Sequence, residues 1–214
     1  MRVTAIEKQR RGKRVNLFLD GRFVLSLSPD VAVQAGLRAG DEVDDESVHS
    51  LREAESRAGA MATALRLLSY RPRSESELRQ RLARRGTSPD LVDGTLQRLR
   101  ELDLVDDAAF ARGWVESRHR SSPRGRRLLR QELQAKGVGG DVSRPLLEQI
   151  DEEDAALRAG GRRALSLRTS PYPEFRRRLV DFLRRRGFDY DTVRRTVERL
   201  WQELAEEEDP HLSG

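Results

Sequence analysis

Residues 127–138, Arg127-Leu-Leu-Arg-Gln-Glu-Leu-Gln-Ala-Lys-Gly-Val138, contain the pattern that decides the fold of this chain. In this stretch a glycine follows a basic residue and has leucines four and eight residues upstream. The same arrangement occurs three times, with intervals of 51 and 50 residues between the glycines. A period of this length is typical of repeat proteins, in which a helical unit buries its apolar face only against its neighbours. The positions are Leu78, Leu82 and Gly86; Leu129, Leu133 and Gly137; and Leu179, Leu183 and Gly187.

Each of these leucine–glycine elements is interpreted as the middle helix of a three-helix unit. The glycine is expected to end the helix in the left-handed conformation, and the cation before it to interact favourably with the helix dipole. Ser74, with a glutamate three residues later, has the spacing of a capping box, and Pro123 is expected to begin the corresponding helix of the second unit. Leu65 and Leu68 are expected to face inward from a first helix over 48–69. The inward residues of the third helices are expected to be Val92, Leu96 and Leu99; Val142, Leu146 and Ile150; and Val193, Val197, Leu200 and Leu204.

The N-terminal part of the chain has a different pattern. Two β-type runs flank the pair Asp20-Gly21, which is a hairpin signal. A strict two-residue turn would put the apolar side chains out of phase, so one extra loop residue or a bulge is expected to bring Leu17 opposite Leu25. The expected elements are strands over 15–19 and 23–27, with residues 3–6 as a third strand, and a helix over 29–35 that ends at Gly36.

The sequence therefore predicts a mainly α-helical protein, with three tandem three-helix repeats preceded by a small β-rich N-terminal module. The expected boundaries are 1–46 for the β-hairpin-containing module, 47–103, 104–151 and 152–204 for the three repeats, and 205–214 for an acidic tail.

The composition excludes several classes of protein. Charged residues make up 36% and aromatic residues 5% of the chain, so the core must be thin and aliphatic, as in stacked helices. No stretch approaches the ~20 apolar residues that a spanning helix needs, and the N-terminus lacks the apolar region of a signal peptide. Because there is no cysteine, disulfides and thiolate metal sites are excluded. A cytoplasmic location and no cofactor are expected.

Basic residues are concentrated in the helical part. Residues 1–50 hold eight basic and eight acidic side chains, whereas residues 51–202 hold 33 basic against 23 acidic ones. This surplus favours an anionic partner, either a nucleic acid or an acidic protein groove. The predominance of arginine over lysine is not a functional signal, because it is typical of a GC-rich genome.

Three segments of the sequence resemble the motifs of the RecX family of recombination regulators. The first is Arg71-Pro-Arg-Ser-Glu-Ser-Glu-Leu-Arg79 with the following Leu82 to Gly86; the second is Leu104-Val-Asp-Asp-Ala-Ala-Phe-Ala111, continuing to Trp114 and Arg118; the third is the stretch over 127–138. The resemblance covers residues 55–202 in the family's order and spacing. It implies a non-catalytic protein that binds RecA along the groove or at the end of the RecA–DNA filament. It also implies restraint of RecA ATP hydrolysis, filament growth and strand exchange, and for some members direct binding of DNA.

A groove-binding role requires a continuous charged face, and arginines away from the leucine stripes are the candidates for it. At 100° per residue Arg177, Arg184 and Arg185 lie away from the apolar stripe of their helix. Comparable positions occur in the other two units, and arginine binds carboxylates and phosphates equally well. The predicted RecA- or DNA-binding residues are Arg79, Arg81, Arg84, Arg118, Arg124, Arg127, Arg130, Arg177, Arg184 and Arg185.

The aromatic residues are assigned structural roles. Phe110 and Trp114 are four residues apart on one helix and are expected to pack in the core. Tyr70 and Tyr172 occupy corresponding loops and are expected to hydrogen-bond a neighbouring helix, in preference to stacking on bases.

Two alternatives to a RecA regulator remain open. An autonomous DNA-binding protein would use the arginine-rich face on phosphates, and an adaptor would recruit a partner through its charge-neutral β module. Enzymatic readings find little support, because His49, His119 and His211 lack metal-ligand spacing and Gly12-Lys13 lacks the other residues of a phosphate loop.

Overall fold

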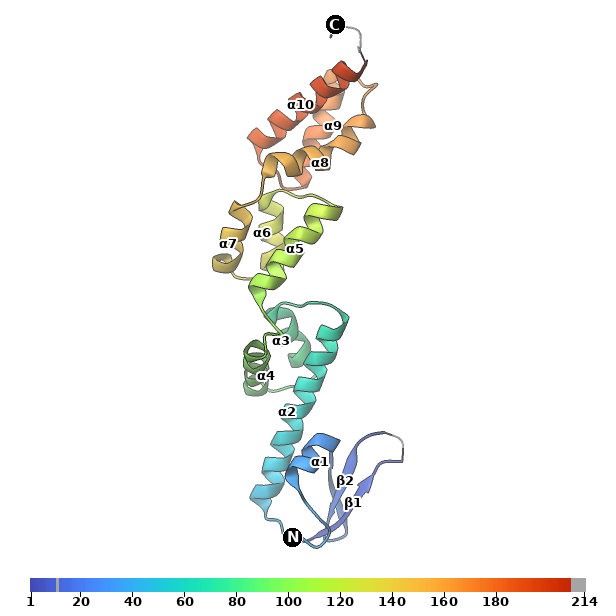
Figure 1. The fold of residues 1–214 in the computed structure, drawn as a ribbon, viewed down its shortest axis with the longest axis vertical. Coiled ribbons are helices and arrows are strands. Elements are labelled where there is room, and N and C mark those ends of the chain that lie inside the picture. The colour runs from blue at the N-terminus through green and yellow to red at the C-terminus, as the bar shows by residue number, and fades with distance from the viewer. Residues whose placement is uncertain (11, 209–214) are drawn as a thin grey trace. The chain divides into compact units, whose positions relative to one another are not determined.

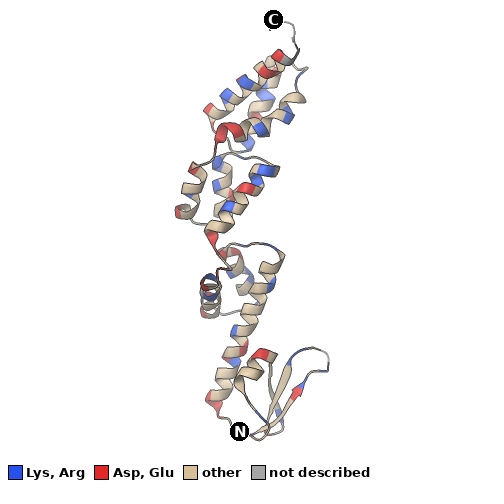
Figure 2. Cartoon of the chain, viewed as in Figure 1, with Lys and Arg blue, Asp and Glu red and all other residues tan. Residues whose placement is uncertain are grey.

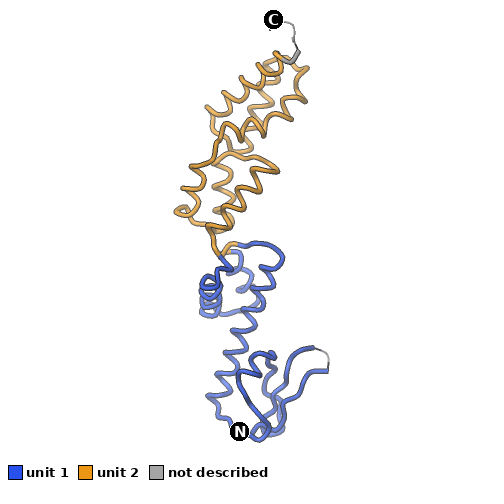
Figure 3. Tube along the Cα trace, in the orientation of Figure 1, with its two compact units in different colours: residues 1–73, 77–105 blue, residues 74–76, 106–214 orange. Residues whose placement is uncertain are grey.

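The computed structural model describes residues 1–10 and 12–208, in which three strands precede ten helices (Figure 1). The chain divides into two compact units (Figure 3). Unit 1 comprises Met1–Arg73 and Glu77–Val105, and unit 2 comprises Ser74–Ser76 and Asp106–Gly214. The expected fold class, three helical repeats after a small β-rich module, is confirmed.

The N-terminal sheet is antiparallel, with strand order β1-β2-β3. Its hairpin turns through Asp20 and Gly21, which both have positive φ, and the register then shifts between Leu17 and Phe18. This bulge pairs Leu17 with Leu25, as predicted, because it returns the apolar side chains of both strands to one face. The strands are β1 (Val3–Lys8), β2 (Val15–Leu19) and β3 (Arg22–Leu27).

Helix α1 (Pro29–Ala35) ends at Gly36 with φ 63°, as expected. The long helix α2 (Asp45–Tyr70) begins after Asp44, whose carboxylate accepts a hydrogen bond from the Ser47 amide at 2.8 Å. One end of α2 packs against the sheet and α1, and the other end packs against the next two helices. A single helix of 26 residues therefore contributes to both hydrophobic cores of unit 1.

The prediction that Leu65 faces inward is wrong. Its side chain is 42% exposed in an open groove, beside Leu91 and Thr95. The core side of α2 is formed by the small residues Ala60 and Ala64, and Leu65 lies outside this core, in the groove that α2 lines together with α4. Leu68 packs against the core, as predicted.

The remaining helices of the first repeat are α3 (Glu75–Ala83) and α4 (Pro89–Glu101). Leu78 and Leu82 are fully buried, and Val92, Leu96 and Leu99 cover them from α4. Gly86 has φ 80°, so the left-handed end predicted for the middle helix is confirmed.

In the second repeat, α5 (Asp107–Ser121), α6 (Arg126–Ala135) and α7 (Gly140–Glu148) enclose a core around Leu129 and Leu133. Helix α6 does not begin at Pro123 as predicted. Gly125 is extended, with ψ 159°, and its amide donates to the Arg186 carbonyl at 2.9 Å. This tertiary hydrogen bond holds the segment outside the helix until Arg126.

The inward face of α7 is shifted by one residue from the prediction. Ser143 and Leu147 are the buried residues of this helix. The predicted Val142, Leu146 and Ile150 are half-buried at the edge of the same core.

The third repeat consists of α8 (Glu152–Leu165), α9 (Tyr172–Arg185) and α10 (Tyr190–Glu208). Gly160 lies where α8 meets its neighbours, and a Cβ there would stand 2.9 Å from Leu200 Cδ1. The glycine therefore allows close helix packing, which offsets its low helix propensity. Helix α10 includes the first residues of the predicted acidic tail, and residues 209–214 lie outside the described part of the chain. The buried residues of the third repeat include Phe175, Leu179, Leu183, Val193, Val197 and Leu200.

Two pairs of helix N-termini within unit 2 are joined by the same kind of hydrogen bond, and we call each of them a junction. The carboxylate of Asp107, the first residue of α5, accepts from the Glu75 amide at 2.8 Å. The carboxylate of Glu152, the first residue of α8, accepts from the Arg126 amide at 2.8 Å. In each case the first residue of one helix caps the first amide of another helix, from which it is distant in the sequence. The preceding aspartates, Asp106 and Asp151, cap their own helices.

The recurring glycine takes part in the same junctions. A Cβ on Gly137 would overlap the Ser76 side chain, and one on Gly187 would stand 2.6 Å from the Leu128 nitrogen. Gly137 and Gly187 thus satisfy two requirements, a left-handed backbone with φ 77° and 86° and a close tertiary approach. A Cβ on Gly86 would meet no described atom within 4 Å.

The Asp107 junction predicts a pH dependence of stability. Burial raises the pKa of the Asp107 carboxyl, although the hydrogen bond from the Glu75 amide opposes this shift. Because the folded pKa then lies above the unfolded one, protonation favours the folded state. The contribution is full at low pH and is lost as pH rises through the folded pKa. We therefore expect the stability of wild type relative to Asp107→Asn to increase as pH falls from neutral toward the unfolded pKa.

Urea unfolding of both proteins at neutral pH and in the acidic range measures this difference. Glu152→Gln should behave in the same direction, because burial also raises the pKa of Glu152. A stability difference that is constant or moves the other way would contradict the assignment.

Candidate functional site

Part of the predicted arginine surface is assembled where α6 begins and α9 ends. Arg127 donates from Nη2 to the Arg184 carbonyl oxygen at 3.2 Å, so arginines of two repeats lie side by side within unit 2. Arg177, Arg184 and Arg185 are exposed, and none of their side chains has an ion-pair partner among the described residues. Arg130 is also exposed. These arginines are therefore available to a partner.

Two other predicted residues are engaged inside the second repeat. Glu132 accepts from Trp114 Nε1 at 2.8 Å and from Arg118 Nε at 3.0 Å, and Arg124 pairs with the same carboxylate. The Arg118 guanidinium also lies over the Trp114 ring, 4.5 Å from its centroid. Partial burial, followed by the charges of Arg118 and Arg186, lowers the pKa of Arg124. Arg118 and Arg124 thus hold α5, α6 and the intervening loop together.

The predicted arginines of the first repeat lie in unit 1. Arg79 on α3 forms an ion pair with Asp93 on α4. Arg81 and Arg84 are exposed and have no ion-pair partner among the residues that the structure describes. The positions of the lysine and arginine residues along the helices of each unit are coloured blue in Figure 2.

The aromatic residues follow the predictions only in part. Phe110 and Trp114 stack with ring centroids 5.9 Å apart, which confirms their packing role. The expected hydrogen bonds of Tyr70 and Tyr172 are absent in the described part of the chain. Tyr70 is 77% exposed, whereas Tyr172 packs its ring on Trp201 with centroids 5.2 Å apart.

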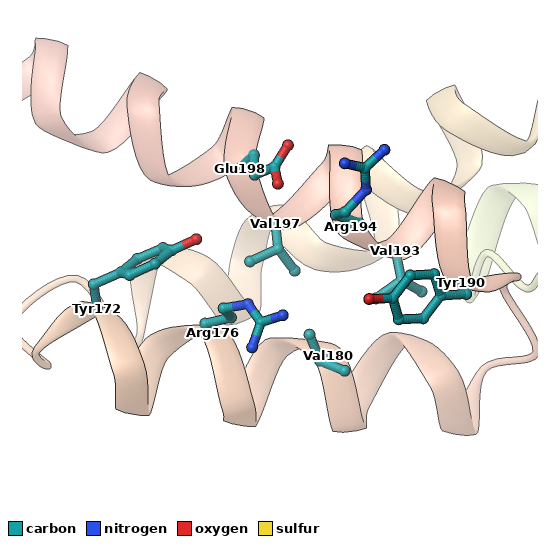
Figure 4. A pocket seen from close by; sticks show the side chains of 8 residues that line it. All are labelled: Tyr172, Arg176, Val180, Tyr190, Val193, Arg194, Val197 and Glu198. Atoms are coloured by element: carbon teal, nitrogen blue, oxygen red, sulfur yellow. The ribbon is translucent and has the colours of Figure 1, made fainter.

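A small pocket lies between α9 and α10 (Figure 4). Tyr172 and Tyr190 stand at its two ends, and Arg176 and Arg194 approach it from the two helices. Its volume of about 30 Å³ leaves room for little more than a water molecule. This pocket is too small for a nucleobase or another organic ligand.

A cluster of five further arginines was not predicted from the sequence. They line a cleft formed by the end of α5, the following loop, α8 and the end of α9. The arginines are separated along the chain by up to 66 residues, so only the tertiary structure brings them together. They are Arg120, Arg158, Arg162, Arg163 and Arg186.

The two histidines in the described part of the chain have separate partners. His49 lies 3.3 Å from Glu53, His119 contacts Arg158, and His211 lies outside the described residues. Across residues 1–10 and 12–208, no group of three or more histidine, aspartate or glutamate side chains is placed to hold a metal ion. Within the same residues, no helix has both the length and the apolarity needed to cross a membrane.

The fold and these surfaces define a helical-repeat protein that presents unpaired arginines to its surroundings. Four segments match models of RecX domains: the N-terminal domain over residues 1–44 and the first, second and third three-helix domains over 60–99, 106–144 and 151–197. This chain belongs to the RecX family of regulatory proteins.

Individual relatives agree with this assignment. The chain is 38% identical over 147 residues to the regulatory protein RecX of Chlorobium limicola, covering 69% of this chain and 92% of the relative. It is 32% identical over 213 residues to that of Levilactobacillus brevis, covering 97% and 78%. The crystal structure of a regulatory protein RecX superposes with a TM-score of 0.73 at 25% identity, covering 92% of this chain and all of that one.

Proposed function

We propose that this protein binds RecA and its nucleoprotein filament in the cytoplasm, and that it restrains RecA ATP hydrolysis, filament growth and strand exchange without catalysing a reaction. Membership of the RecX regulatory family supports a regulatory role. The observation that carries the proposed binding surface is the group of exposed, unpaired arginines on α9, in which Arg184 lies next to Arg127 of α6.

The proposed mechanism depends on how arginine recognises carboxylates. A guanidinium donates two parallel hydrogen bonds to a carboxylate, which gives both affinity and orientation. Successive helical repeats then present such groups to adjacent RecA subunits at the same time. Contacts that bridge subunits restrain the changes at their interface that accompany ATP hydrolysis and filament growth. The candidate residues on exposed surfaces are Arg81, Arg84, Arg127, Arg130, Arg177, Arg184 and Arg185.

Replacement of Arg177, Arg184 and Arg185 by glutamate should weaken the inhibition of RecA at least tenfold. The three side chains are exposed and outside the core, so the fold should be retained, whereas charge reversal opposes an acidic partner. The measurement is DNA-dependent ATP hydrolysis by RecA over a range of concentrations of this protein.

The control is the triple variant Arg22, Arg52 and Arg66 to glutamate. These residues are also exposed and carry the same charge, but they lie on β3 and α2. The control should inhibit like wild type, and circular dichroism should show that both variants are folded. Full inhibition by the folded α9 variant would refute the proposed surface, and absence of inhibition by wild type would refute the function.

A further inference from the structure

The arginine-lined cleft of unit 2 has the composition of an anion-binding site. It combines five guanidinium groups with the side chains of Ser121, Ser122 and Ser166. No carboxylate is among its described lining residues. In Figure 2 basic residues mark the end of α5 and the part of helix α8 that follows its acidic first turn, and these two segments form two of the cleft's walls. A surface of one sign at a concave site concentrates anions from solution.

Two of the five arginines are fixed by contacts to the protein. Arg158 pairs with Asp154 at 3.7 Å and donates to the His119 carbonyl at 3.0 Å. Arg186 donates to Ser122 Oγ at 2.8 Å and to the Pro123 carbonyl at 3.3 Å. These contacts connect α8 and the end of α9 to the end of α5 and its following loop, and so they maintain the shape of the cleft.

The other three arginines have no such contacts. Arg120, Arg162 and Arg163 are exposed, and no described residue forms an ion pair or hydrogen bond with their side chains. Three like charges gathered in this way repel one another, and an anionic ligand would relieve the repulsion. The cleft therefore combines a fixed frame with three free cationic groups.

The chemistry of the lining favours phosphate groups over an acidic polypeptide. Arginine and serine are among the residues that contact nucleic-acid phosphates most often. A protein partner would normally insert an apolar or aromatic anchor into a site of this kind. Here the largest apolar group, Phe182, is half-buried, and the Arg186 guanidinium lies 4.5 Å over its ring. That arrangement also covers one face of the ring, so this face is not open to stacking on a base.

We propose that this cleft binds the phosphate backbone of a nucleic acid without regard to base sequence, through Arg120, Arg162 and Arg163. The three proposed residues lie on α5 and α8, whereas the proposed RecA-binding arginines of unit 2 lie on α6 and α9. Binding at the cleft does not require RecA. Nothing in the lining distinguishes single-stranded from duplex DNA, because both present the same phosphates.

The test is fluorescence anisotropy with the full-length protein and no RecA. The probes are a fluorescein-labelled thymidine homopolymer and a labelled duplex of mixed sequence. Arg120, Arg162 and Arg163 are changed together to glutamine, and Arg22, Arg52 and Arg66 to glutamine form the control. The cleft variant should bind at least tenfold more weakly, whereas the control should bind like wild type.

Salt dependence gives a second readout. Loss of three phosphate contacts should reduce the slope of log affinity against log salt by about 2.7 for the duplex and about 2 for the single strand. The single variant Arg162→Gln should reduce it by about one third of that amount, which keeps the test valid if the triple variant unfolds. Unchanged affinity and slope in the folded variants would overturn the proposal.

Competition with poly-glutamate distinguishes a site for phosphate groups from a site for carboxylate groups. Poly-glutamate should displace the DNA probes much less effectively than an unlabelled oligonucleotide does. Equal displacement would overturn the assignment to phosphate. Because RecA is absent from these measurements, their failure leaves the ATPase result for the α9 variant unaffected, and the reverse also holds.

Discussion

Gly187→Ala should lower the free energy of unfolding by about 2–5 kcal/mol. Part of the loss, about 1–2 kcal/mol, arises because alanine is strained at φ 86°. The rest arises because the new Cβ would stand 2.6 Å from the Leu128 nitrogen, where backbone cannot move aside as a flexible side chain could. Overpacking of this kind typically costs about 1–3 kcal/mol. Urea-induced unfolding followed by circular dichroism measures the loss.

Gly86→Ala is the matched control, because its cost arises from the strained backbone conformation of alanine alone. Gly86 also has a left-handed backbone, with φ 80°, but a Cβ there would meet no described atom within 4 Å. We expect its cost to be about 1–2 kcal/mol. Equal losses at both glycines would show that the close approach at Gly187 contributes nothing to stability.

Leu133→Ala should cost about 2–5 kcal/mol, the range for deletion of a fully buried leucine. Leu133 is completely buried and packs in a core with Phe110, Leu129 and Leu147. This core is small, so few side chains can move to fill the cavity that the substitution leaves. Thermal or urea unfolding measures the loss, and any decrease in inhibition of RecA should disappear at temperatures where the variant is fully folded.

Leu65→Ala provides the comparison for this prediction. The same atoms are removed from a side chain that is 42% exposed at the edge of an open groove. Its cost should remain below about 1 kcal/mol, because no enclosed cavity is created. A loss as large as that of Leu133→Ala would mean that Leu65 is buried in solution.

Local patterns in the sequence predicted most of the fold. The spacing of Leu78, Leu82 and Gly86 defines a helix and its end through interactions within a few residues, and so it is independent of tertiary context. The β-hairpin bulge followed from the requirement that Leu17 and Leu25 share one face. Predictions of this kind succeed because burial and turn geometry leave a single consistent arrangement.

The predictions failed where distant residues decide the local structure. Pro123 does not begin α6, because the Gly125 amide is bound by the carbonyl of Arg186. Leu65 fits the helical period but lines the open groove that α2 forms with α4, outside the core. In both cases the local structure depends on residues that are distant in the sequence, and the periodicity of the chain does not show where those residues lie.

The candidate site was predicted less completely than the fold. Exposure of Arg177, Arg184 and Arg185 followed from the angle between these positions and the leucine stripe. The engagement of Arg124 by Glu132 did not, because a loop places it there. No sequence pattern indicated the arginine cleft either, because its residues come from separate helices of two repeats.

Helix α2 has a mechanical consequence for the N-terminal module. An unbroken helix of 26 residues extends over about 39 Å and resists bending, since each turn is tied to the next by backbone hydrogen bonds. The sheet and α1 pack against one end of α2, and α3 and α4 pack against its other end. A ligand that twists or displaces the sheet would therefore move α3 and α4 as well. The movement would pass along α2, because this helix is continuous from the sheet to the first repeat.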